Sequence, residues 1–434
     1  MINYYERNYN YMSIIIKTPF RSSDLETDPV VYGLRPEELR QGIYQLYNDK
    51  SLLITGTRGI GKSSFCYQLQ KIIKGDDTLL KRCGLEISMP KFITVSYVCT
   101  PDDTIETIIL SIINDLEAQI EDCAEKYKVK AKEFDVSIFG FFKSKIAIEQ
   151  TETKKYNTLI SSFIEIIHKY TQVYVEPHIN IALDELDQVN SQHNIAHFIK
   201  VILEQLNRKG DNYLSFILAG QNSLFDTLYN SQPAFHRIVK HINLLPLDEE
   251  YSRDVLQACL KRAEIPTEIE NRCEELFLNI TCGYPYNIQL LGNEMFNCML
   301  EKYNNMPKEF IIDEKDLLGG LKNVIVSEDQ RYTILLEELE SNEKGILFML
   351  ADSGVSSCPY EFTQESIEAG LSIQDDKIRE EEARKVIKSL LNKQIIRKVE
   401  NDIFREDRYV FQEEIFRIYL FDRINNERKL SLYD

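Results

Sequence analysis

Short apolar runs alternate with helical patterns in the first half of the chain. Runs of four to seven apolar residues between helices are typical of strands buried in a parallel sheet. Four such runs occur, at 51–55, 92–98, 179–183 and 214–219. A helical pattern over 65–73 follows the first of them. This alternation predicts an α/β fold with a parallel sheet at its core.

The second half of the chain has a different pattern. From 248 to about 325 the apolar spacing is purely helical, and from 327 onward helices precede two apolar segments around a polar tip, 400–402. Helices followed by a two-stranded wing are typical of a winged-helix domain. The changes in pattern predict four regions. They are a linker with a lead-in helix at 1–50, an α/β core at 51–247, a helical region at 248–326 and a winged helix at 327–434.

A long insertion, about 102–177, separates the second and third apolar runs. Its ends have helical spacing, and its middle, 136–148, has the pattern of a hairpin. The insertion either packs on its own helices or forms an arm that contacts a partner or a polymer.

Composition limits the classes of partner. The 434 residues carry 51 Lys and Arg against 69 Asp and Glu, a net charge of −18. Nonspecific binding to nucleic acid or to an anionic membrane needs excess positive charge, so both are disfavoured, although a local basic patch is compatible with this balance. The apolar runs are shorter than a membrane span. The nine cysteines are scattered without metal-ligand spacing, which favours a cytoplasmic protein with reduced thiols.

The strongest motif follows the first apolar run. Eight residues between a predicted strand and a predicted helix fit the pattern G-x-x-x-x-G-K-[ST], and Ser64 follows them: Gly56, Thr57, Arg58, Gly59, Ile60, Gly61, Lys62 and Ser63. In such a loop successive backbone N–H groups at a helix N-terminus surround phosphate oxygens. Lys62 is expected to reach the β- and γ-phosphates, and the Ser63 hydroxyl to bind Mg²⁺. The motif predicts binding of ATP or ADP.

The third apolar run ends in two acids. Asp184 is placed to hold Mg²⁺ through water, and Glu185 to activate the attacking water. The alternative is a solvated acidic turn that caps a helix. Asp187, three residues after Asp184, receives no role from the sequence.

Two further polar positions follow. The fourth run ends at Gly220, and Gln221, with Asn222 as the alternative, is placed to sense the γ-phosphate if this strand lies between the two motif strands. Arg237 precedes a last expected strand, 244–247. An arginine there is placed to neutralise charge at the γ-phosphate of a neighbouring subunit, or else it forms a surface ion pair.

These residues resemble the AAA+ superfamily, and more narrowly the branch of replication-initiator, transposition-regulator and STAND signalling ATPases. The resemblance covers about 20–325 and includes a degraded "G-R-x-x-E-L" box at 32–35 and the segment Gly283–Tyr284–Pro285. It implies an AAA+ P-loop core, a helical lid over 248–326, ATP between lid and core with Pro285 near it, and assembly into homo-oligomers. In this family the box contacts the adenine side.

One departure from the family concerns the lid. Initiator-like ATPases place an arginine after the proline of this segment, whereas this chain has Tyr286. The resemblance then implies the STAND form, with slow or partner-stimulated turnover. In the expected winged helix, basic residues including Arg384, Lys385 and Lys388 follow three glutamates. They form either a DNA-contacting face or a solvated or protein-docking face.

Three hypotheses of function therefore remain. The first is an Mg²⁺-dependent ATPase that acts as an oligomerising switch and recruits a separate effector protein, for example in bacterial defence signalling. The second is a DNA-binding regulator that resembles initiator or transposition ATPases. In the third, the nucleotide is only a structural ligand. Acidic charge and Tyr286 favour the first hypothesis over the second.

Overall fold

The computed structural model divides the chain into two compact units, which are described separately. The core unit comprises Asp24–Ser252 and Cys282–Tyr286, and the second unit comprises Met1–Ser23, Arg253–Thr281 and Asn287–Asp434. The structure describes residues 16–22, 24–127, 152–173, 178–190, 192–302, 309–353, 359–399 and 407–430. The hairpin expected over 136–148 lies outside these residues. No helix in the described ranges is long and apolar enough to cross a membrane.

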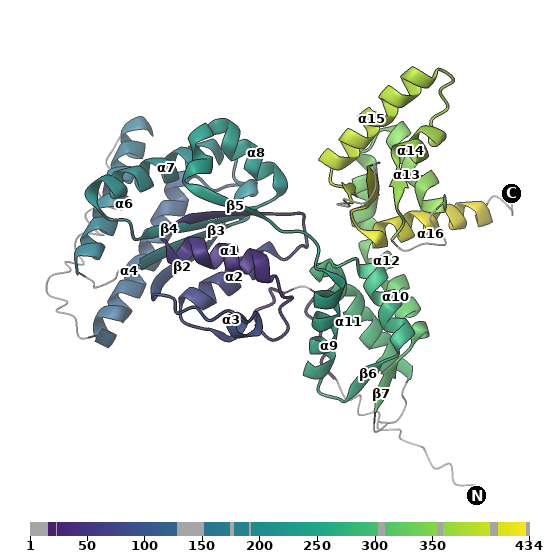
Figure 1. Ribbon diagram of the computed structural model, residues 1–434, viewed down its shortest axis with the longest axis horizontal. Helices are drawn as coiled ribbons and strands as arrows, with labels where there is room; N and C mark the ends of the chain where they lie inside the picture. Colours follow the sequence, from purple (N-terminus) through teal and green to yellow (C-terminus); the bar gives the residue numbers. More distant parts are fainter. Residues whose placement is uncertain are drawn as a thin grey trace, which may run out of the picture. The chain divides into compact units, whose positions relative to one another are not determined.

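A five-stranded parallel sheet forms the centre of the core unit, in the order β2-β3-β4-β1-β5 (Figure 1). The strands are β1 (Ser51–Thr55), β2 (Phe92–Val98), β3 (His178–Asp184), β4 (Leu214–Gly220) and β5 (Val239–Asn243). The parallel α/β core and its first four strands are confirmed. Strand β4 lies between β1 and β3, so the segments that follow these three strands begin at the same edge of the sheet.

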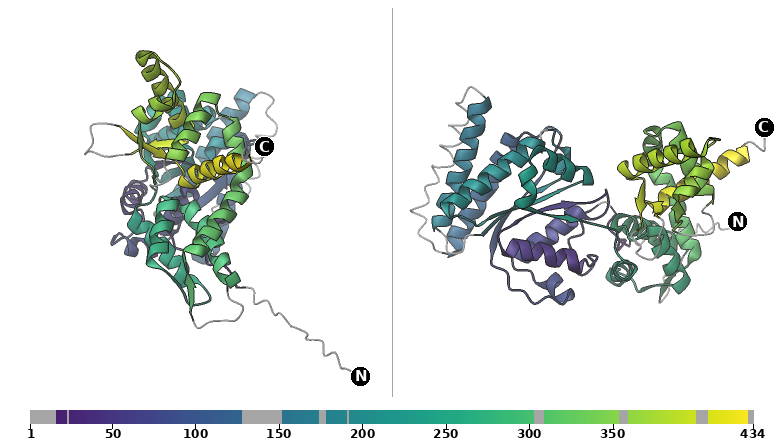
Figure 2. Two further views of the ribbon diagram at one scale, coloured as in Figure 1. Left: turned by 90° about the vertical axis from the view of Figure 1, so that its right-hand side faces the viewer. Right: turned by 45° about the horizontal axis from the view of Figure 1, so that its top comes forward.

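Helices cover both faces of the sheet (Figure 2). Alternate side chains of a strand point to opposite faces. Leu52 and Ile54 of β1 therefore join the cluster under α1 (Pro36–Tyr47), α2 (Lys62–Ile73) and α3 (Thr78–Arg82), whereas Leu53 joins the other cluster. That second cluster lies under α4 (Ile105–Tyr127), α6 (Glu152–Val173), α7 (Gln192–Lys209) and α8 (Asn222–Ser231).

The last strand differs from the sequence prediction. It spans Val239–Asn243, not 244–247, and it pairs with β1 along its whole length. Three of its five residues, Lys240, His241 and Asn243, are polar, which disguised this edge strand in the sequence. Leu244 still donates its N–H to the Thr55 carbonyl at 2.8 Å, but Pro246 has no N–H with which to continue the ladder.

The second unit begins with a helical region that also contains two short strands. Its helices are α9 (Glu249–Arg262, whose first turn belongs to the core unit), α10 (Asn271–Thr281), α11 (Pro285–Lys302) and α12 (Glu314–Glu337). Strands β6 (Thr267–Ile269) and β7 (Phe310–Ile312) pair in parallel, so the expectation of a purely helical pattern here was wrong. Three-residue strands are too short to leave an alternating pattern in the sequence.

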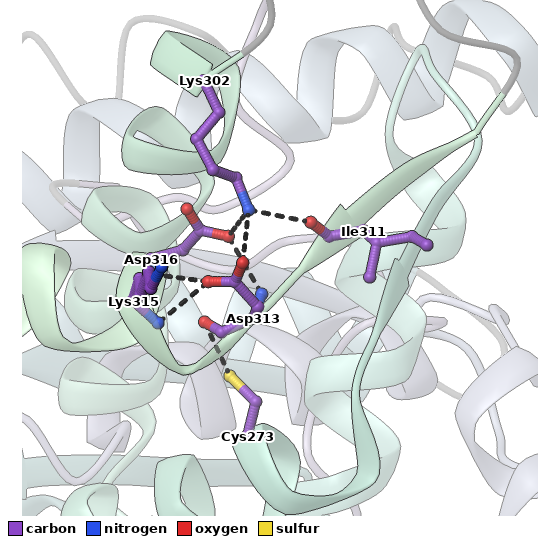
Figure 3. A network of polar contacts seen from close by, with 6 residues as sticks. All are labelled: Cys273, Lys302, Ile311, Asp313, Lys315 and Asp316. Atoms are coloured by element: carbon purple, nitrogen blue, oxygen red, sulfur yellow. Dashed lines mark hydrogen bonds and ion pairs between the residues drawn. The ribbon is translucent and has the colours of Figure 1, made fainter.

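A polar network fixes the start of α12 (Figure 3). The Asp313 carboxylate accepts N–H groups of Lys315 and Asp316, and the Asp316 carboxylate accepts the Asp313 N–H, a reciprocal capping box. The Lys302 ammonium at the end of α11 pairs with Asp313 at 3.0 Å and also with Asp316. The network joins α11 to α12 through charged hydrogen bonds.

The C-terminal part of this unit packs helices against a small antiparallel sheet, ordered β8-β10-β9. Its elements are α13 (Ser341–Ser353), β8 (Phe362–Thr363), α14 (Gln364–Gly370), α15 (Asp376–Asn392), β9 (Ile396–Lys398), β10 (Arg408–Phe411) and α16 (Glu414–Leu430). Arg331 of α12 donates to both Glu413 oxygens, at 3.0 and 2.7 Å, and so ties α12 to this part. The expected tip, 400–402, lies outside the described residues.

Candidate functional site

The loop between β1 and α2 has the geometry of a phosphate-binding loop. Gly59 and Gly61 have φ angles of 79° and 93°, in the left-handed region that favours glycine. At Gly56 a side chain would meet Ile60 and the Leu244 carbonyl. All three glycines of this loop are thus required by backbone conformation or close packing. The loop then delivers Lys62 as the first residue of α2, where free N–H groups and the helix dipole favour an anion.

The Lys62 ammonium lies over the loop. Its Nζ donates to the carbonyls of Gly56 and Thr57, each at 3.0 Å. Burial lowers the pKa of Lys62 below its ordinary 10.5, while the negative charges of Asp187 and Asp184 oppose that shift. The lysine and these two acids therefore share one electrostatic environment, although they are more than 120 positions apart in the sequence.

The lead-in segment supports the loop from behind. Arg35 is only 5% exposed, and its guanidinium donates to the Ile60 carbonyl at 3.0 Å and to the Leu245 carbonyl at 2.6 Å. Because that guanidinium is engaged with backbone groups, Arg35 braces the phosphate loop. Ser64, assigned to cofactor binding from the motif, accepts the Glu26 N–H on its Oγ at 3.2 Å.

The segment Cys282–Tyr286 contacts the same loop within the core unit. The Tyr286 N–H donates to the Gly59 carbonyl at 3.2 Å, and the Tyr284 hydroxyl lies 3.4 Å from the Thr57 hydroxyl. A side chain at Gly59 would meet the Tyr286 methylene, and one at Gly61 would touch the Pro285 ring. This segment therefore packs directly on the residues expected to bind phosphate.

The three acids at and after the end of β3 differ in their hydrogen-bond partners and exposure. Asp184 accepts the Glu185 N–H on Oδ1 at 2.9 Å, and Glu185 is an exposed residue with a left-handed φ of 52°. Asp187, in the short 3-10 turn Leu186–Gln188, accepts from Gln221 twice, from the backbone N–H and from Nε2, each at 3.0 Å. Asp187 is thus the acid that joins β3 to β4. The only sequence signal for it was its position three residues after Asp184.

The two alternatives for the γ-phosphate sensor have different environments. Gln221 is engaged with Asp187, as described above. Asn222, the first residue of α8, buries its Oδ1 without a hydrogen-bond partner among the described residues. Both residues follow β4, beside the acids at the end of β3.

Arg237 is not brought to this site. It ends the 3-10 turn Pro233–Arg237 just before β5, whose first residue, Val239, pairs with Ser51 at the start of β1. The phosphate loop follows the other end of β1. Four residue steps of strand, roughly 13 Å, separate the two ends. Arg237 therefore lies at the opposite end of the strands from Lys62.

The residues present fit Mg²⁺ bound together with a triphosphate. No group of three or more His, Cys, Asp or Glu side chains in the described ranges could hold a metal ion by itself. Mg²⁺ commonly keeps several waters and uses one or two protein oxygens plus substrate phosphates. Ser63 and Asp184 are the oxygen donors that the motif and the sheet supply next to Lys62.

Comparison with known proteins agrees with this geometry. Residues 45–228 match the family model described as an AAA domain. No curated protein sequence matches the chain.

Among solved structures, the chain is similar to the Aeropyrum pernix ORC2 protein in ADPNP–ADP complexes, with a TM-score of 0.49, 12% identity and coverage of 92% of this chain and 95% of that one. It is also similar to Cdc6p from Pyrobaculum aerophilum, with a TM-score of 0.44, 15% identity and coverage of 94% and 98%. Drosophila ORC bound to DNA gives a TM-score of 0.40, 10% identity and coverage of 92% and 88%. The strand order and the family match together identify the core fold as that of an AAA+ P-loop NTPase, with the AAA domain at residues 45–228.

Proposed function

We propose that this protein binds and hydrolyses ATP with Mg²⁺ and uses the nucleotide as a switch for self-assembly. The observation that carries the proposal is the shared environment of Lys62, Asp184 and Asp187 beside a glycine-rich helix N-terminus. A cationic loop next to carboxylates suits a polyphosphate with its metal ion. Binding a simple anion would require only the loop, so the carboxylates favour the metal-bound polyphosphate.

Each residue of the proposed site has a defined task. The N–H groups of 56–64 and the Lys62 ammonium bind the β- and γ-phosphates, and Ser63 and Asp184 hold Mg²⁺. When bound, Mg²⁺ would supply positive charge to the β- and γ-phosphate oxygens and so stabilise the ADP leaving group. Glu185, exposed beside Asp184, orients and deprotonates the attacking water. Gln221 senses the γ-phosphate, and its side chain changes partner from Asp187 when it does so.

Two features support slow, assembly-dependent turnover. Arg237 lies at the far end of the strands and can act only on the nucleotide of another subunit. Tyr286 occupies the position at which initiator-like ATPases carry an arginine, and its N–H is bonded to Gly59. The assembled form would then recruit a separate effector protein, with bacterial defence as the proposed setting and the cytoplasm as the proposed location.

The decisive experiment measures the mass of the purified protein in solution with ADP, with ATP and with a non-hydrolysable ATP analogue. The switch predicts a larger species with ATP or the analogue than with ADP, and no such change in Lys62→Ala. Phosphate release is measured on the same samples. A mass that does not respond to nucleotide in the unaltered protein would refute the switch, and bound nucleotide without phosphate release would make it a structural ligand.

A DNA-binding regulator is the second candidate. The C-terminal helices and three-stranded sheet are interpreted as a winged helix, and Arg384, Lys385 and Lys388 are exposed on α15. However, Arg384 pairs with Glu380, and Lys385 pairs with Glu381 and Glu382 on the same helix. These pairs cancel part of the positive field that DNA would need. Duplex binding that falls steeply with salt and is lost in Arg384→Glu/Lys388→Glu would favour this candidate.

A further inference from the structure

A pocket lies at the edge of the sheet in the core unit, beside β5 and the start of β1. Its volume is about 470 Å³, within the range of small-molecule sites. Its lining comes from α1, β1, α8, β5, the residue before β1 and the 3-10 turn before β5, and it includes Lys50, Phe225, Tyr229, Arg237, Lys240 and His241. Nothing in the proposed ATP site uses this pocket except Arg237, so its lining needs its own explanation.

Aromatic rings form one wall of the pocket. The rings of His241 and Phe225 stack with centroids 4.3 Å apart and planes 17° apart, and Phe225 stacks in turn with Tyr229 at 5.9 Å and 12°. His241 is fixed by a 2.7 Å contact between its Nε2 and the Thr55 hydroxyl. Tyr229 is 42% exposed, and its ring also meets the tilted ring of His236, with centroids 5.7 Å and planes 55° apart. The pocket thus presents a pre-arranged ring surface against which another planar ring can stack.

The remaining lining is cationic. Lys50, Arg237 and Lys240 all line the pocket, and no acidic residue does. In the part of the chain that the structure describes, none of these three side chains forms an ion pair. The pocket therefore gathers three basic residues in a chain whose 69 acidic residues outnumber its 51 basic ones. A cavity lined by one sign of charge concentrates ligands of the opposite sign.

We propose that this pocket binds a nucleotide, with the base stacked on the ring column at Tyr229 and the phosphate held by Lys50, Arg237 and Lys240. Rings together with unpaired cations match a ligand that carries both a planar ring and negative charge. The volume suits a single nucleotide unit and excludes a duplex. The nucleotide is either free or part of a single-stranded nucleic acid, since both present the same base and phosphate.

This second nucleotide is independent of the one at the phosphate loop. One consequence rests on the proposed function: a phosphate in the pocket would engage the Arg237 guanidinium and withhold it from the neighbouring subunit. Occupancy of the pocket would then slow hydrolysis in the assembly without changing ATP affinity at the phosphate loop.

The test uses the full chain with Lys62→Ala, so that the phosphate loop does not contribute. Binding of AMP, of a short oligodeoxythymidylate and of inorganic phosphate is measured separately by calorimetry at one salt concentration. One equivalent of AMP or of oligonucleotide is expected per chain. Adding Tyr229→Ala should weaken that binding about 5- to 150-fold, which corresponds to the loss of one base–aromatic stack. Lys240→Glu should weaken it as well.

Matched controls are Tyr44→Ala, which removes an exposed tyrosine outside the pocket, and Lys74→Glu, which reverses the charge of an exposed lysine just after α2. Both should leave binding unchanged. AMP binding identifies a free nucleotide as the source, and binding of the oligonucleotide alone identifies a single strand. The proposal is overturned if neither binds, if Tyr229→Ala and Lys240→Glu have no effect, or if inorganic phosphate binds as tightly as AMP. Unchanged ATP affinity in Lys62→Ala would instead refute the proposed function.

Discussion

Gln221 is bound to Asp187 through two hydrogen bonds, from its backbone N–H to Oδ1 and from its side-chain Nε2 to Oδ2, each 3.0 Å long. The pair joins the end of β4 to the turn after β3, and Asp187 is also the acid with the largest electrostatic effect on Lys62. A single carboxylate therefore connects the proposed γ-phosphate sensor to the phosphate-binding lysine. The arrangement suggests that Asp187 holds the sensor in place until a γ-phosphate competes for it.

We expect Asp187→Asn to lower kcat for ATP hydrolysis by about 10²-fold, because the variant misplaces Gln221. Steady-state phosphate release at saturating ATP measures the effect. Gln188→Ala, a change at the exposed neighbour in the same turn, is the matched control. Equal losses in Asp187→Asn and in the control would argue against a specific role.

Lys62→Ala should weaken ATP binding about 10- to 150-fold, since one charged hydrogen-bond donor is worth about 1.5–3 kcal/mol. Calorimetry with the non-hydrolysable analogue isolates binding from turnover. Lys71→Ala on the same helix, which breaks only an ion pair with Asp76, serves as the control and should bind normally. Retained affinity in Lys62→Ala would remove the basis of the phosphate-loop assignment.

The position of Arg237 at the far end of the strands predicts complementation between subunits. Arg237→Ala alone and Lys62→Ala alone should each lose most of the hydrolysis, by up to about 10³-fold for the arginine. Mixing the two should restore activity, because a subunit with intact Lys62 can then receive Arg237 from its neighbour. Activity is measured against mixing ratio, and mixtures no more active than the separate variants would show that Arg237 does not act in trans.

Comparing alanine variants of two glycines with positive φ distinguishes the effect of backbone strain from the effect of a contact at the site. Gly59 faces Tyr286, whereas a side chain at Gly75, with φ of 104°, would meet no atom within 4 Å. Both Gly59→Ala and Gly75→Ala should cost about 1 kcal/mol of folding free energy. Only Gly59→Ala should also reduce ATP affinity, because the added methyl group displaces Tyr286 or the loop. Thermal unfolding and analogue binding of the two variants give the comparison.

A buried carboxylate in the C-terminal part predicts a pH dependence of stability. Glu343 is 3% exposed; its burial alone would raise its pKa, but hydrogen bonds with Lys393 and Ser389 outweigh burial and hold the pKa below the ordinary 4.5. A depressed carboxylate pKa stabilises the folded state above the unfolded pKa, and this contribution is lost as pH falls through the folded value.

Glu343→Gln should therefore cost about 1 kcal/mol at pH 7, and the difference from the unaltered protein should stay constant down to about pH 5 and shrink below it. Thermal unfolding of both proteins across this range is the measurement. Glu365→Gln, at an exposed glutamate of α14, is the control. A difference that grows toward acid would contradict the assignment.

The sequence predicted the fold and the site best where the residue types needed for the local backbone conformation are also those that bind phosphate. Strand β1 and the glycines after it were recognisable because backbone conformation dictates those residue types. The edge strand β5 was expected too late in the chain, at 244–247, because its polar positions, such as Lys240 and His241, hide the strand pattern. The role of Asp187 depends on β4 lying beside β3, and that of Arg35 depends on carbonyls at Ile60 and Leu245, so neither leaves a local pattern.

The contact between Tyr286 and Gly59 has a mechanical consequence. Pro285 and Tyr286 are the first two residues of α11, an 18-residue helix of roughly 27 Å. The helix is pinned at its amino end to the loop that would grip a triphosphate. The first two residues of α11 belong to the core unit and its other residues to the second unit, so the backbone of this one helix connects the loop that would bind a triphosphate to the second unit.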